Sequence, residues 1–203
     1  MRLQARGLLG KPEQPVPMDQ ALVALVGTCL RATDSLAVGL RRRSGESAAI
    51  SLSFHRLGDM TVEHIAAPAD EHGSEVHSLT ALVDGDAVVN RVVQLVVQPP
   101  DGRDLDLGSI SVETLERVRA AVAAGADEAL VALAPELAHA FKEADIFGQL
   151  IRIHDGEPAA SLTVLSRPGE VWSFLQPTPE DSEVTVRRVS PTALRSQIAN
   201  LWS

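Results

Sequence analysis

Residues 147–176, FGQLIRIHDGEPAASLTVLSRPGEVWSFLQ, contain three short segments whose apolar residues are spaced as in β-strands. The segments are Phe147–His154, Ala160–Arg167 and Glu170–Gln176. Turn-forming residues separate them, Asp155-Gly156-Glu157-Pro158 after the first segment and Pro168-Gly169 after the second. Because strands joined by such short turns pair antiparallel, this stretch predicts an antiparallel sheet.

The same signals predict strands in the rest of the chain. We expect Asp84-Gly85-Asp86 to form a hairpin turn, because Asp-Gly between two apolar runs is a strong hairpin signal. The further predicted strands are Ser35–Arg43, Ala48–Arg56, Thr61–Ala67, Glu75–Asp84, Ala87–Gln98 and Glu183–Val189.

Four helices are expected between these strands. Asp19 can cap a helix over Gln20–Thr33, and Ser111 and Ser190 can cap two later ones. A further helix near Pro135 has an uncertain start, because proline either breaks a helix or begins one. The residues expected on the apolar faces are Leu22, Leu25, Val26, Cys29 and Leu30 in the first helix, Leu115, Val118 and Val122 in the second, Leu130, Leu133, Leu137 and Phe141 in the third, and Leu194, Ile198 and Leu201 in the last.

Strands that run in blocks, with helices between the blocks, favour an α+β fold of antiparallel sheets with helices packed on one side. The Pro- and Gly-rich residues 1–17 predict an N-terminal arm or loop, and residues 18–203 a single α+β domain. Each strand block ends in a helix with a serine cap, which leaves open a duplication into quasi-symmetric halves, 18–125 and 126–203.

The charge balance disfavours nucleic acid as a partner. The 203 residues carry 27 acidic and 18 basic side chains, and Arg41-Arg42-Arg43 is the one dense basic cluster. No apolar run approaches the roughly 18 residues that a membrane span needs, so no membrane partner is expected. The lone Cys29 and the lack of an apolar leader segment predict a cytoplasmic protein.

The sequence contains no convincing catalytic motif, so we expect no enzyme, no catalytic residue and no cofactor. It lacks a G-x-S-x-G elbow, and Pro12 stands where a phosphate-binding loop needs serine or threonine. The alternative is a small metal-dependent enzyme in which His55, His64 and His77 converge on one sheet face. Its nearest carboxylates would be Glu63, Glu71 and Glu75.

Leu57 and Met60 are apolar residues at a predicted hairpin end, where polar ones are usual, and they are the candidate partner-binding residues. Trp172 and Trp202 are expected to pack in the core rather than to bind. We expect the protein to be a monomer or a homodimer. A homodimeric structural domain, paired through a strand edge such as Glu183–Val189, is the third alternative.

Several segments together resemble the EspG family of ESX (type VII) secretion-associated chaperones, with this chain as a short member. The resemblance implies a cytosolic actinobacterial chaperone of two quasi-symmetric α+β halves. Such a chaperone binds the helical tip of a secreted, PPE-like substrate and keeps it soluble for export. The segments that carry the resemblance are Arg6-Gly7-Leu8-Leu9, the helix Gln20–Thr33, His77–Asp86, Gln149–Asp155, Ser161–Ser166, Gly169–Phe174 and Ser190–Trp202.

Overall fold

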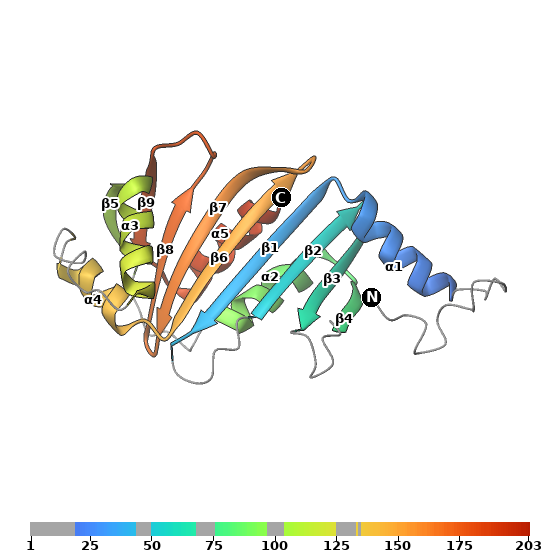
Figure 1. Ribbon diagram of the computed structural model, residues 1–203, viewed down its shortest axis with the longest axis horizontal. Helices are drawn as coiled ribbons and strands as arrows, with labels where there is room; N and C mark the ends of the chain where they lie inside the picture. The colour runs from blue at the N-terminus through green and yellow to red at the C-terminus, as the bar shows by residue number, and fades with distance from the viewer. Residues whose placement is uncertain (1–18, 44–49, 68–75, 97–103, 125–132, 134) are drawn as a thin grey trace.

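The computed structural model describes residues 19–43, 50–67, 76–96, 104–124, 133 and 135–203. One sheet of nine strands, in the order β4-β3-β2-β1-β6-β7-β8-β9-β5, runs through the molecule (Figure 1). All neighbouring strands in it are antiparallel. The strands are β1 (Asp34–Arg42), β2 (Ile50–Leu57), β3 (Met60–Ala67), β4 (Val76–Leu82), β5 (Leu105–Ser111), β6 (Ile146–His154), β7 (Glu157–Arg167), β8 (Glu170–Gln176) and β9 (Glu183–Arg188).

The helices confirm the predicted α+β class. Helices α2 and α5 pack against each other and cover one face of the sheet, which we call the back face (Figure 1). On the opposite, front face, α1 lies over β2 and β3, and α3 and α4 lie at the other end, beside β8 and β9. The helices are α1 (Gln20–Arg31), α2 (Gly85–Val96), α3 (Val112–Ala123), α4 (Pro135–Glu143) and α5 (Pro191–Trp202).

Two apolar cores hold these layers together. The back core joins α2 and α5 to the central strands, with Val92, Ile198, Leu36 and Leu150 fully buried within it. The front core joins α3 and α4 to β7, β8 and β9. Trp172 and Trp202 are 4% and 5% exposed, which confirms that both tryptophans pack inside the protein.

The order of elements repeats within the chain. α1-β1-β2-β3-β4-α2 is followed, after β5 and α3, by α4-β6-β7-β8-β9-α5. The two series meet where β1 pairs with β6, and Val38 opposite Leu150 is the middle of that ladder. Each series runs outward through four consecutive antiparallel strands and ends in a back-face helix. The division at residue 125 stays a prediction; β5 and α3, which precede it in the chain, pack with β9 and the front core.

Two predictions about the sheet need correction. Residues 87–96, predicted as part of a strand, belong to α2, and Asp84 forms no hairpin. Its side chain instead accepts a hydrogen bond from the backbone N–H of Ala87 (2.7 Å), as a helix cap does. The valines of α2 face the back core at helical spacing, and this packing overrides their preference for strands.

The second correction concerns the edges of the sheet. β5 was not expected, and it pairs with β9, so Glu183–Arg188 lies inside the sheet and offers no free edge. The dimer edge predicted at Glu183–Val189 is therefore wrong. The outer strands of the described sheet are β4 and β5.

Candidate functional site

The β2–β3 turn brings both candidate partner-binding residues to one end of the sheet. Leu57 and Met60 face each other across the two-residue turn Gly58-Asp59, and Gly58 has φ +59°, a value that glycine adopts without strain. Met60 is 40% exposed and Leu57 is partly buried. The structure thus places a partly exposed methionine beside the turn.

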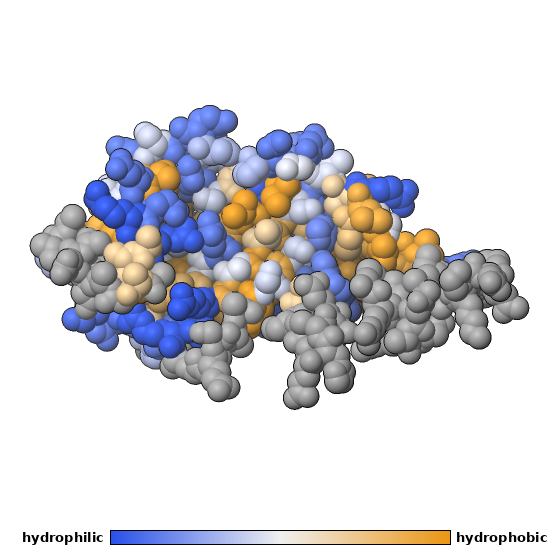
Figure 2. Space-filling model, in the orientation of Figure 1, coloured by the Kyte–Doolittle hydropathy of each residue, from blue (hydrophilic) through white to orange (hydrophobic). Residues whose placement is uncertain are grey.

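Helix α1 lies against this turn and adds more apolar surface. Thr28 is buried on its inner side, and its hydroxyl donates to the Met60 sulfur (3.1 Å). Leu30, two residues further on, was expected on the buried stripe, but it is 80% exposed. Val23 is 45% exposed, and no charged residue occurs between Asp19 and Arg31. A surface helix normally has a polar outer face, and α1 lacks one (Figure 2).

We call Leu30, Leu57, Met60 and Val83 the apolar end. Val83 is 94% exposed and follows Leu82, which pairs with Thr61, the neighbour of Met60. Sequence analysis missed Val23, Leu30 and Val83. The signal available for α1 was its unbroken run of uncharged residues from Gln20 to Leu30, which a helix packed on one side does not need.

The three histidines of the predicted metal site do lie near one another on the front face. The ring centroids of His55 and His64 are 6.1 Å apart, and those of His64 and His77 are 5.1 Å apart. His64 and His77 also share a hydrogen bond (Nε2 to Nδ1, 2.9 Å). Burial lowers the pKa of His55 and of His64, and the neighbouring imidazole lowers each pKa further. Both shifts favour the neutral ring at His55 and at His64.

These contacts do not suit a metal centre. Both ring nitrogens of His55 already hydrogen-bond to serine hydroxyls, Ser35 (3.0 Å) and Ser53 (2.8 Å). Glu63 lies on the other face, where it accepts from Arg91 (2.8 Å). In the part of the chain that the structure describes, no group of three His, Cys, Asp or Glu side chains could hold a metal ion. Glu71 and Glu75 lie outside the described residues.

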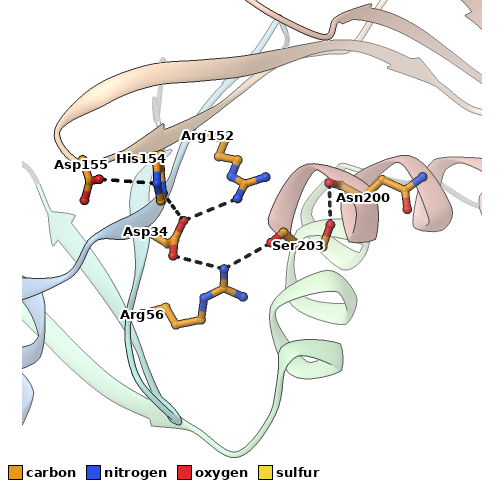
Figure 3. A network of polar contacts seen from close by, with 7 residues as sticks. All are labelled: Asp34, Arg56, Arg152, His154, Asp155, Asn200 and Ser203. Carbon is orange, nitrogen blue, oxygen red and sulfur yellow. Dashed lines mark hydrogen bonds and ion pairs between the residues drawn. The ribbon is translucent and has the colours of Figure 1, made fainter.

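A polar network ties the central strands to the last helix (Figure 3). Asp34, on β1, accepts from His154 on β6 (2.8 Å) and pairs with Arg56 on β2 (3.4 Å). Arg152 lies 3.5 Å from the same carboxylate, and Arg56 also reaches the Ser203 backbone oxygen. The hydrogen bond from His154 is the main cause that lowers the pKa of Asp34. At the end of α5 the Ser203 hydroxyl donates to the Asn200 backbone oxygen (3.0 Å), so the network joins β1, β2 and β6 to the C-terminal end of the last helix.

A groove opens on the front face between α3 and the central strands, with a volume of about 630 Å³. Arginines of the Arg41–Arg43 cluster and Arg119 of α3 line it. Sequence analysis noted the cluster only as an argument about nucleic acid. It could not place Arg119, about 75 residues further along the chain, at the same groove.

The described helices include none that is long and apolar enough to cross a membrane. Comparison with known proteins adds no relative: no protein-family model matches the chain, and no curated protein matches it.

Proposed function

We propose that the protein is a non-catalytic, cytosolic chaperone of the EspG type. It binds the helical tip of a secreted, PPE-like substrate in a 1:1 complex and keeps that substrate soluble for type VII export. The observation that carries the proposal is the apolar end, the exposed apolar surface of α1 and of the strand ends next to it, where Thr28 of α1 contacts Met60 and Val83 follows the strand that pairs with Thr61.

Burial of such residues against a partner is favourable by roughly 25 cal/mol for each Å² of apolar surface. Leu30 is 80% exposed and Val83 is 94% exposed, so most of their apolar area stays in contact with water in the free protein. An amphipathic helix tip has the complementary property, an apolar face that aggregates unless it is covered. One apolar surface covering another gives the chaperone its affinity.

The repeat of elements also supports an EspG-like protein, because two α+β halves are what that resemblance implies. α1 and the β2–β3 turn belong to the first series of elements, and their counterparts in the second are α4 and the β7–β8 turn Pro168-Gly169. There the apolar residues of the helix are covered, since Leu137 and Phe141 are buried in the front core. The first series alone leaves its helix with an exposed apolar side.

The test is co-expression of the untagged protein with the helical ESX substrates of its own genome, followed by size-exclusion chromatography. We expect one substrate to co-elute in a 1:1 ratio. The double variant Leu30→Gln/Met60→Gln should retain the fold and lower the amount of co-eluting substrate about tenfold, because it removes the apolar contact. Val76→Thr is the matched control, since Val76 is as exposed as Met60 (41% and 40%) but lies at the far end of β4.

Two results would contradict the proposal. One is a wild-type protein that elutes alone beside every helical ESX substrate tested. The other is a double variant that retains as much substrate as the Val76→Thr control does.

A further inference from the structure

The groove beside α3 has a floor of small and polar side chains. Ser51, Gly39, Gln149 and Thr163 pair in one row across β2, β1, β6 and β7. A Cβ atom added at Gly39 would meet no other atom within 4 Å. Gly39 and Ser51 are exposed, so another chain can approach the sheet closely at this end of the row.

Among the described residues, the positive charge around this floor is only partly paired. Arg41 and Arg42 are exposed and form no ion pair with the described residues, although the whole chain carries a net charge of −9. Arg119 is bound to Glu116 (2.8 Å) and to the Gln149 side-chain oxygen (3.0 Å), which holds its guanidinium over the floor. Four arginines and one glutamate line the groove, so its local charge is opposite to that of the protein.

Apolar side chains lie between these charges. Phe147 and Val122 of α3 line the same groove, and the Arg43 guanidinium stacks on the Phe147 ring. Arginine binds carboxylates through paired hydrogen bonds, and the apolar lining adds contact area. A ligand with both acidic and apolar side chains matches this lining better than a free anion does. A nucleic acid matches it less well, because the described groove has one aromatic side chain on which a base could stack.

We infer that the groove binds an acidic, amphipathic segment of a protein partner. Arg41 and Arg119 hold its carboxylates, and its backbone lies over Gly39. This inference rests on the proposed protein-binding function and adds the chemistry of a second contact, on the open sheet away from the apolar end.

The experiment uses a fluorescein-labelled, helix-forming peptide of about four turns, with glutamates on one face and leucines on the other. A second peptide has lysines in place of the glutamates. We expect fluorescence anisotropy to show that the full protein binds the acidic peptide more tightly than the basic one. A protein of net charge −9 would otherwise prefer the basic peptide, so this order identifies the groove. Affinity should fall between about 50 and 300 mM salt.

Variants locate the binding. Gly39→Phe adds a strand-favouring side chain in open space, so it should leave the melting temperature unchanged or raised, yet abolish peptide binding. Arg41→Gln should weaken binding about three- to tenfold, and Arg41→Gln/Arg119→Gln further. Arg117→Gln is the control, because it removes an equal charge from α3 outside the groove.

Unchanged affinity in Gly39→Phe or in the double arginine variant would overturn the inference, and so would tighter binding of the basic peptide. A single-stranded oligonucleotide that displaces the acidic peptide more effectively than unlabelled peptide would overturn it in favour of nucleic acid. The peptide assay is separate from the co-expression assay. A substrate that co-elutes while the acidic peptide fails to bind would sink this inference alone.

Discussion

At the scale of single residues, the Asp34 side chain connects three strands. Its carboxylate contacts β2 through Arg56 and β6 through Arg152 and His154, and Arg56 stacks on the Trp202 ring of α5 (4.8 Å to the ring centroid). Sequence analysis gave Asp34 no role, because these partners come from segments as far apart as residues 56 and 154. A charged residue at the start of a strand reads from sequence as a solvated one.

We predict that Asp34→Asn lowers the free energy of unfolding by about 1 kcal/mol at neutral pH, since half-exposed partners screen the lost ion pairs. The pKa of Asp34 is lowered in the folded protein, so its stabilisation is complete above the ordinary aspartate value of 3.8 and is lost as pH falls through the folded-state pKa. The difference between variant and wild type should therefore shrink in acid. Urea unfolding at several pH values measures this.

Asp155→Asn is the matched control for that experiment. Asp155 lies 3.5 Å from the other side of His154 and is 69% exposed, and asparagine tolerates its φ of +49°. Its loss should change stability by a few tenths of a kcal/mol at most. If both variants lose equal stability, the Asp34 network does not stabilise the fold more than an exposed ion pair does.

At the scale of elements, the sequence predicts hairpins well and the type of one valine-rich element badly. The β7–β8 turn is specified locally, because Gly169 supplies a φ of +84° and Pro168 a fixed one. The type of α2 depends on packing against α5, which local preference does not contain. Val88, Val92 and Val96 do recur at helical spacing, and with the cap at Asp84 they were the signal for α2.

We predict that Asp84→Ala costs about 1 kcal/mol of stability, because it leaves the Ala87 N–H at the start of α2 without its side-chain acceptor. Asp59→Ala, in the β2–β3 turn, is the control, since the Asp59 side chain forms no described hydrogen bond. Guanidinium unfolding followed by circular dichroism compares the two. Equal stability of Asp84→Ala and wild type would mean that α2 does not depend on this cap.

At the scale of the whole molecule, the candidate surfaces come from tertiary structure more than from motifs. Leu57 and Met60 could be found from sequence because a hairpin end is a local feature. The groove could not, because Gly39, Gln149 and Arg119 meet only when β1 pairs with β6 and α3 folds over the front face. The same pairing joins the two series of elements in one continuous sheet.

We predict that Leu150→Ala, in the middle of the β1–β6 ladder, lowers the free energy of unfolding by about 2–4 kcal/mol, since Leu150 is fully buried in the back core. Tryptophan fluorescence, which reports on Trp172 and Trp202 in the second series, and circular dichroism, which reports on all elements, should show one shared transition. Two separate transitions in the wild-type protein would show that the series unfold independently.

The pairing of β1 with β6 also delays completion of the sheet while the chain is being synthesised. Arg42 can pair with Ile146 only after about one hundred further residues have been synthesised. A ribosome adds roughly 5–20 residues per second, so the inner edge of β1 stays open for about 5–20 s on the nascent chain. During that interval the apolar residues of the first half, Leu36 and Val38 among them, have only half of their final sheet. A protein proposed to cover the apolar surface of other proteins thus exposes apolar surface of its own during synthesis.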